Sequence, residues 1–186
     1  MGAPRRRVRA LAAAEGIAVL ISIRSELPGD RDGVRRVNEL AFEGSIEADI
    51  VDALRGSDAW LPGLSLVAED GAEIVGHALF SLVRLDTGPE LLSLGPMAVL
   101  PDRQRAGVGS ALVRRGLERA RGTRYPLAVV LGHPDYYPRF GFRPARRYGI
   151  ETPYEAPDEA WLALPLPAYD ERVRGIVLYP PAWESV

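Results

Sequence analysis

The chain has 186 residues and a net charge of −2, a length that fits one domain and a charge that gives no broad basic surface for nucleic acid. Hydrophobic residues make up 47% of it, but no apolar run reaches the roughly 18 residues of a membrane-spanning helix, so we expect a cytoplasmic protein with no membrane partner. All 23 cationic side chains are Arg and there is no Cys, which excludes a catalytic thiolate, a lysine Schiff base and the lysine of a P-loop.

The N-terminal segment, residues 1–16, is rich in Arg and Ala, and we expect a disordered tail ahead of a single domain that spans 17–186. A signal peptide is the alternative, but charges follow the apolar stretch closely and no convincing cleavage site is present. A nucleic-acid-binding arm would rest on four arginines alone, so we expect no nucleic-acid partner.

Hydrophobic periodicity predicts the elements of the first half of the chain. A β-branched, apolar stretch predicts a strand at 18–25. Two helices follow, one after the turn at 28–30 and one at 46–55. Their predicted apolar faces consist of Val34, Val37, Leu40 and Ala41 in the first and Ile46, Ile50, Val51 and Leu54 in the second. The pair Asp70-Gly71 is a hairpin signal between predicted strands at 64–69 and 73–85.

The second half continues the alternation. A strand at 91–100 ends at Pro101, and a helix follows at 107–121. Residues 127–131 are all apolar, so the strand at 126–131 is predicted to be buried throughout. A short helical stretch at 135–140 and two strands at 161–164 and 175–179 complete the order. This order predicts an α/β (α+β) fold with one mixed sheet.

The strongest local motif lies at 104–109, between a predicted strand and a predicted helix. Gly107 and Gly109 remove side chains where a backbone must approach a ligand closely. Free N–H groups at a helix start, together with the helix dipole, favour an anion such as a pyrophosphate. The alternative is an ordinary turn with a tolerated glycine. A different nucleotide-binding protein is a further alternative, but the first glycine of a Rossmann motif and the P-loop lysine are both missing.

With its neighbours, this motif resembles the acyl-CoA-binding motif of the GNAT N-acetyltransferases. The matching residues are 94–101, ending Val-Leu-Pro, followed by 104–109. Residues 131–142 resemble the second motif of the family, which ends Tyr-x-x-x-Gly-Phe, and are most similar to a branch of predicted N-acetyltransferases with a Tyr-Tyr-x-Arg-Phe-Gly-Phe segment. The likeness runs from about residue 23 to residue 183. One departure is His133, where the branch pattern has Asp.

The resemblance implies the GNAT fold, a mixed central sheet with two strands splayed to admit acyl-CoA and flanked by helices. It implies acetyl-CoA as cosubstrate, no metal, and direct transfer to an amine in a ternary complex. The alternative is a non-catalytic acyl-CoA sensor or interaction module. Backbone N–H groups at 97–99 would polarise the thioester carbonyl if the strand bulges there. The implied cofactor-binding residues are Met97, Ala98, Val99, Gln104, Arg105, Ala106, Gly107, Val108, Gly109 and Ser110.

The family places its general-acid tyrosine at Tyr137. A phenol has a pKa of about 10 against about 8.5 for a thiol, so Tyr137 is expected to stabilise the leaving thiolate rather than to protonate it fully. A packing tyrosine is the alternative, since buried aromatic pairs are common. Packing or a substrate contact is the expected role of Tyr136.

The attacking amine must lose a proton, and several groups are candidates to accept it. They are Glu43, Glu47, Asp49, His133 and a water relay. Singly, each carboxylate is more often just a solvated surface charge, and His77 is expected to be a core histidine. With two histidines in the chain, a three-histidine zinc site is excluded. The acceptor stays open between a small molecule and a protein amine, and so does a homodimer.

Overall fold

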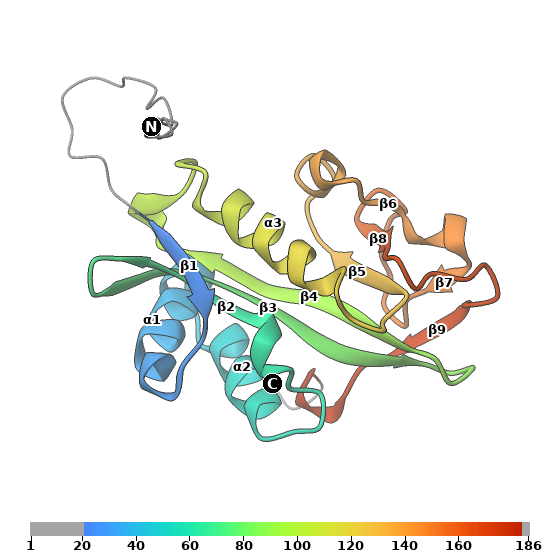
Figure 1. Cartoon of the computed structure of the whole chain (residues 1–186), viewed down its shortest axis with the longest axis horizontal. Helices are drawn as coiled ribbons and strands as arrows, with labels where there is room; N and C mark the ends of the chain where they lie inside the picture. The colour runs from blue at the N-terminus through green and yellow to red at the C-terminus, as the bar shows by residue number, and fades with distance from the viewer. Residues whose placement is uncertain (1–20, 184–186) are drawn as a thin grey trace, which may run out of the picture.

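The computed structural model describes residues 21–183 of the chain. The predicted tail at 1–16 and the first residues of the strand predicted at 18–25 lie outside the described residues. Within 21–183, helices lie on both faces of a central sheet (Figure 1). The predicted mixed α/β fold is confirmed, with most element ends within one or two residues of the expected positions.

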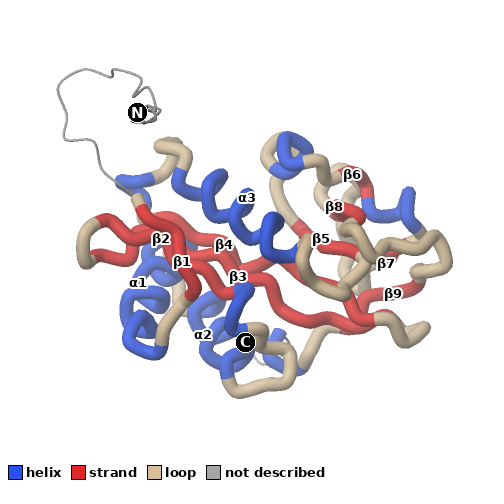
Figure 2. The backbone as a smooth tube through the Cα atoms, in the orientation of Figure 1, coloured by secondary structure: helices blue, strands red, loops and turns tan. Residues whose placement is uncertain are grey.

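The sheet has the strand order β1-β2-β3-β4-β5-β8-β6, and β9 pairs with the far end of β3 and with β7 (Figure 2). Neighbours are antiparallel except for β4 with β5 and β7 with β9. The strand bounds are β1 Ser22–Ser25, β2 Ser65–Asp70, β3 Glu73–Leu85, β4 Glu90–Val99, β5 Leu127–Leu131, β6 Arg143–Pro144, β7 Ile150–Glu151, β8 Trp161–Pro165 and β9 Gly175–Leu178.

Three α-helices cover the sheet, with α1 and α2 on one face and α3 on the other (Figure 1). Their bounds are α1 Arg31–Phe42, α2 Ile46–Arg55 and α3 Val108–Ala120. Short 3-10 turns, numbered separately, lie at η1 Pro28–Asp30, η2 Pro62–Leu64, η3 Pro101–Arg103, η4 Tyr137–Phe140, η5 Ala145–Tyr148 and η6 Pro181–Trp183. The helix α1 ends at Glu43, whose backbone is left-handed and donates to the carbonyl of Glu39.

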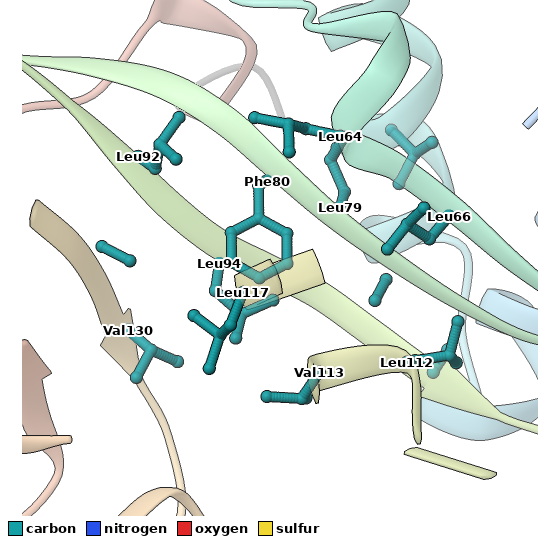
Figure 3. Close-up of a cluster of buried hydrophobic side chains, with 14 of the residues drawn as sticks. Leu64, Leu66, Leu79, Phe80, Leu92, Leu94, Leu112, Val113, Leu117 and Val130 are labelled. Atoms are coloured by element: carbon teal, nitrogen blue, oxygen red, sulfur yellow. The ribbon is translucent and has the colours of Figure 1, made fainter. Parts of the chain in front are cut away.

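Aromatic and branched side chains of the long strands meet α3 in the main core (Figure 3). Phe80 of β3 is fully buried among leucines of β4 and α3. A Cβ built on Gly116 of α3 would lie 2.1 Å from the Phe80 ring, so only glycine allows this helix to pack so closely on the sheet. The close packing fixes where α3 begins, and that end borders the site described below.

Three apolar residues lie differently from the prediction. Leu40 and Ile46 were expected on the buried faces of α1 and α2, but they are 45% and 55% exposed, because they lie at the helix ends on either side of the α1–α2 corner. Leu131 was expected to be buried with the rest of β5, yet it is 46% exposed, because β5 loses its β4 neighbour before its last residue. Two short strands, β6 and β7, were not predicted.

Candidate active site

A fork between β4 and β5 opens into a large cleft within residues 21–183. The two strands pair only through Leu92 with Ala128 and Ser93 with Val129, although both continue beyond these pairs. Past Ser93 they diverge, and a cleft of about 1160 Å³ opens between them. The pair of splayed strands expected from the sequence is therefore present.

One wall of the cleft carries a bulge in β4. Ala78 of β3 faces Met97 and Phe80 faces Leu94, so Gly95 and Pro96 together oppose a single β3 residue. Gly95 has a φ of 152°, and the Gly95–Pro96 peptide bond is cis. Both residues line the cleft. The sequence expectation was a bulge at 97–99, but these residues pair regularly with β3 and the bulge lies immediately before them, at the edge of the open fork.

At one end of the cleft, a turn joins β4 to α3. The Gln104 side-chain amide donates to the Val99 carbonyl at 3.1 Å and ties the turn to the strand. Gly107 precedes α3 in the left-handed region with a φ of 89°, and Arg105 also has a positive φ of 61°. A Cβ at Gly107 would meet nothing within 4 Å, whereas one at Gly109 would lie 3.0 Å from the Tyr136 hydroxyl. Gly107 therefore serves the backbone conformation, and Gly109 keeps space clear.

Eight of the ten predicted cofactor-binding residues line the cleft, and two do not. Those that line it are Met97, Ala98, Val99, Gln104, Arg105, Gly107, Gly109 and Ser110. Ala106 lies outside the lining, and Val108 is 4% exposed in the core beside Gly76. Val108 could therefore contact a ligand only through its backbone. The binding role of all ten stays a prediction.

Tyr137 lines the cleft on the β5 side and is 6% exposed. Its ring packs edge-on against Tyr136 and Phe142, at centroid distances of 5.1 and 5.8 Å. A Cβ at Gly132 would lie 2.3 Å from the Tyr137 ring, so this glycine makes room for the tyrosine. Burial raises the pKa of the Tyr137 phenol, and the neighbouring Tyr136 raises it further. Tyr137 therefore stays protonated at neutral pH, as a hydrogen-bond donor must.

Tyr136 lies on the α3 side of the same aromatic group. Its hydroxyl is 3.4 Å from the Ser110 hydroxyl, and the Arg139 guanidinium stacks over its ring at 4.8 Å. Arg105 and Arg139 are the two arginines that line the cleft within residues 21–183. The start of α3 therefore combines two cations with the free N–H groups of a helix end, an arrangement that attracts anions.

The candidate proton acceptors separate clearly in space. Glu47 and His133 line the cleft, with Glu47 partly exposed and His133 exposed. Glu43 caps α1 outside the lining, and Asp49 forms an ion pair with Arg35 at 2.8 Å, also outside it. Among residues 21–183, Glu47 is the one carboxylate in the lining. Glu43 and Asp49 are therefore not placed to accept a proton directly from an amine in the cleft.

His77 is the core histidine expected from the sequence, fully buried and hydrogen-bonded on both ring nitrogens. Its Nδ1 lies 3.3 Å from the Asn38 amide nitrogen and its Nε2 lies 3.0 Å from the Ser65 hydroxyl. Because the amide can only donate, the proton is assigned to Nε2. Burial lowers the pKa of His77, although Glu26, 3.5 Å from Nε2, opposes this.

The partner carboxylate, Glu26, is ionised. Burial by itself would raise its pKa, but hydrogen bonds from His77 and Ser65 and the nearby Arg55 lower it overall. Arg55 donates to Glu26 at 2.7 Å. This network lies outside the cleft lining and holds β1, β2, β3, α1 and α2 together.

Aromatic residues for which the sequence predicted no role also line the cleft. Tyr154, Tyr179 and Trp183 line it, as do Phe42 and Ile50. The available signal was the recurrence of aromatic residues in the C-terminal segment, of which 175–179 was predicted only as a strand. What brings them to the fork is the pairing of β9 with β3, a long-range contact that local patterns do not encode.

No group of three or more His, Cys, Asp or Glu within residues 21–183 is arranged to hold a metal ion. None of the described helices is long and apolar enough to span a membrane.

Comparison with known proteins gives consistent matches. A family model described as an acetyltransferase (GNAT) domain matches residues 62–144. The uncharacterized N-acetyltransferase YjhQ of Escherichia coli K12 is 37% identical over 153 residues, which cover 78% of this chain and 84% of YjhQ. The uncharacterized N-acetyltransferase YhbS of the same strain is 32% identical over 142 residues, which cover 75% of this chain and 83% of YhbS.

Two solved structures resemble the fold throughout. The crystal structure of Escherichia coli YhbS in complex with CoA matches with a TM-score of 0.82 at 27% identity, covering 92% of this chain and 96% of YhbS. A GNAT family acetyltransferase from Brucella melitensis, solved in complex with acetyl-CoA, matches with a TM-score of 0.73 at 34% identity. The latter match covers 89% of this chain and 99% of the Brucella chain.

Proposed function

Because the chain belongs to the GNAT acetyltransferase family, we propose that it transfers an acetyl group from acetyl-CoA to an amine acceptor. The observation that carries the proposal is the fork of β4 and β5. It joins a bulged strand, a glycine turn at a helix start and a buried tyrosine around one cleft. Each part supplies something that transfer from a thioester requires.

The residues of the cleft fit acetyl-CoA. Its volume of about 1160 Å³ is generous for an extended ligand, since small-molecule sites generally measure about 300–1000 Å³. Gly107 leaves open space at the start of α3, where the helix N–H groups and Arg105 would hold the pyrophosphate. Acetyl-CoA, when bound, supplies an activated acetyl thioester.

The protein's own groups then act on the reacting atoms. Backbone N–H groups beside the bulge, at Met97–Val99, would hydrogen-bond the carbonyl oxygen as negative charge develops on it. Tyr137 would donate a hydrogen bond to the leaving sulfur. Full proton transfer from an ordinary phenol to a thiolate is uphill by about 2 kcal/mol, and burial makes Tyr137 a weaker acid still. Tyr137 thus stabilises the thiolate, and the thiol proton comes finally from solvent.

The amine must be neutral to attack, and an alkylammonium with a pKa of about 10.4 is largely protonated at neutral pH. Glu47 and His133 are the two titratable candidates that line the cleft and can accept this proton directly. Glu43 and Asp49 could act only through water.

Transfer should be direct, since no Cys is present to form a thiol acyl-enzyme. Initial rates measured with acetyl-CoA and acceptor both varied should give intersecting double-reciprocal lines. Parallel lines, together with an acetylated protein trapped before the acceptor is added, would contradict a ternary complex.

The function itself is tested in two steps. Acetyl-CoA and CoA should raise the Tm of the protein, whereas ATP and NAD should not. A panel of amines is then screened for CoA release with a thiol reagent, to which the protein contributes no background because it has no Cys. Acetyl-CoA binding without CoA release from any amine would favour a non-catalytic acyl-CoA-binding protein instead.

A further inference from the structure

The two ends of the cleft differ in charge and in side-chain type. The end at α3 carries Arg105 and Arg139 together with the glycine turn. Glu47 of α2 and the aromatic side chains of the C-terminal segment also line the cleft, and α2 packs with η6 on the face of the sheet opposite α3 (Figure 1). The bulge at Gly95–Pro96 also lines the cleft, on β4, the strand beside which acetyl transfer is expected. The end opposite α3 is therefore the side from which an acceptor would approach.

Three aromatic residues, Tyr154, Tyr179 and Trp183, form an aromatic wall at this end. The Tyr154 and Tyr179 rings are tilted by 40° with centroids 5.3 Å apart, and the Tyr179 and Trp183 rings are 5.4 Å apart. The Tyr179 phenol interacts with Ser93, the last β4 residue paired with β5. An edge atom of the Trp183 ring lies 3.5 Å from the Cβ position of Gly95. The aromatic wall thus reaches from the root of the fork to the bulge.

Glu47 places a negative charge in these apolar surroundings. Its helix α2 packs against η6, which carries Trp183, so the carboxylate and the aromatic wall belong to adjoining elements. The arginines of α1 and α2 that form ion pairs do so with other carboxylates: Arg35 with Asp49, Arg36 with Glu73 and Arg55 with Glu26. In the described part of the chain, Glu47 has no ion-pair partner of its own. A cation brought by a ligand would meet an uncompensated carboxylate.

We propose that the acceptor is a primary amine that carries an aryl group and no carboxylate. Its ammonium would pair with Glu47 while its ring packs against the aromatic wall, in the offset or edge-on contacts that aromatic rings prefer. A carboxylate next to the amine would face Glu47, with both cations of the lining at the other end of the cleft. This inference rests on the proposed acetyl transfer and assigns its acceptor.

The transfer balances with these groups alone. The ammonium gives up one proton to the Glu47 carboxylate, which later releases it to water. The neutral nitrogen then forms a bond to the acetyl carbon as the carbon–sulfur bond breaks, and the nitrogen loses its second proton to water. CoA leaves as a thiolate that takes a proton from solvent. An N-acetyl arylalkylamine and CoA are the products, and no further reactant is consumed.

Three probe amines test the assignment, with CoA release as the readout. 2-Phenylethylamine has the proposed features, phenylalanine adds a carboxylate to it, and n-butylamine lacks the ring. We expect kcat/KM for 2-phenylethylamine to exceed that of either other amine by about 10-fold or more, a contrast of the size that pocket contacts achieve. A higher kcat/KM for phenylalanine or n-butylamine would overturn the assignment.

Two variants locate the effect in the cleft. Glu47→Gln should lower kcat/KM for 2-phenylethylamine by about 10- to 100-fold, as expected for losing a charged hydrogen-bond partner, and should flatten the acidic limb of its pH profile. Glu39→Gln is the matched control, because Glu39 pairs with Arg35 on α1 outside the lining, and it should leave both unchanged. Tyr154→Ala should lower kcat/KM for 2-phenylethylamine about 5-fold and leave n-butylamine within 2-fold. An unchanged pH profile and rate in Glu47→Gln would overturn the role of the carboxylate.

The acceptor assignment and the proposed function can fail separately. CoA release only with amines that carry a carboxylate or lack a ring would leave acetyl transfer standing and overturn the acceptor assignment. Failure of acetyl-CoA to bind would overturn the function. Even then, calorimetric titration of 2-phenylethylamine into the free protein and into Glu47→Gln decides the acceptor site, because binding must weaken in the variant.

Discussion

Replacing Tyr137 with Phe removes one hydroxyl from the cleft and leaves the ring in place. The edge-on contacts with Tyr136 and Phe142 involve only the ring, and the hydroxyl has no hydrogen-bond partner within residues 21–183. No other group is orphaned by the change, so the free energy of unfolding should change by less than about 1 kcal/mol. The rate of transfer should fall about 10- to 1000-fold, or about 1.4–4 kcal/mol in the activation barrier, because a donor to the thiolate is lost.

Gly132→Ala makes the opposite change, since it keeps the hydroxyl and displaces the ring. The new Cβ would lie 2.3 Å from the Tyr137 ring, about 1 Å closer than an ordinary contact, so the ring must move by a comparable distance. Misplacing a reacting group by about 1 Å can cost about 100-fold in rate. Unlike Tyr137→Phe, this variant also overpacks a buried site and should lower stability by about 1–3 kcal/mol.

The assay compares kcat from thiol-detected CoA release with the Tm of each variant, both with and without acetyl-CoA. Tyr136→Phe is the matched control, because the Tyr136 hydroxyl is directed at Ser110, and its effect on kcat should be much smaller. Full activity in Tyr137→Phe, with activity lost only in Gly132→Ala, would refute the role of the hydroxyl and make Tyr137 a packing residue.

Three further expectations concern ligand binding, packing and pH. Acetyl-CoA at about 100 times its Kd should stabilise the protein by about 2.7 kcal/mol and raise its Tm. Gly109→Glu should abolish this Tm shift, because it places bulk and negative charge at the α3 turn. An unchanged Tm shift in the variant would refute that binding site. Gly116→Ala should destabilise the protein by about 1–3 kcal/mol in urea titrations, because its Cβ would meet the Phe80 ring at 2.1 Å, and a neutral effect would contradict the packing. The pKa of His77 is lower in the folded protein than in the unfolded chain. Below pH 6.5 the unfolded chain therefore binds the proton more readily. The free energy of unfolding should fall by up to about 1.4 kcal/mol per pH unit between pH 6.5 and 5. Glu26, whose pKa is also lowered, stays ionised over this range, and equal slopes for wild type and His77→Gln would refute the assignment to His77.

The central part of the fold was predictable because it is encoded by local signals. The signal Asp70-Gly71 predicted a hairpin, whose turn is Gly71-Ala72, one residue further along the chain. The apolar run at 127–131 and the glycine turn before α3 likewise predicted a strand and a helix start from local sequence. The splayed strands and the bulge came from a family likeness rather than from periodicity. The pattern of hydrophobic residues at 91–100 does not predict the bulge at Gly95–Pro96.

The acceptor end could not be predicted in the same way, because it is assembled from distant segments. Helical spacing places Glu47 and Asp49 on one short helix. Only the tertiary structure shows that Glu47 lines the cleft and that Asp49 forms an ion pair with Arg35. The aromatic wall depends on β9 pairing with β3, a pairing that joins residues more than 90 positions apart. Ile46 was predicted to be buried but is exposed, because helical periodicity does not show which part of a helix the sheet covers.

The fork also leaves two strand edges with free pairing capacity inside a folded protein. Exposed edges commonly recruit strands from other molecules and lead to aggregation. Here α3 lies on one face of the sheet and α1 and α2 on the other (Figure 1), and side chains of all three helices and of the C-terminal segment line the fork. A second sheet cannot enter such a recess, but a slender chain bearing amide groups can. The unpaired backbone groups of β4 and β5 can therefore form hydrogen bonds with a narrow ligand in the cleft, but not with a strand from another copy of the protein.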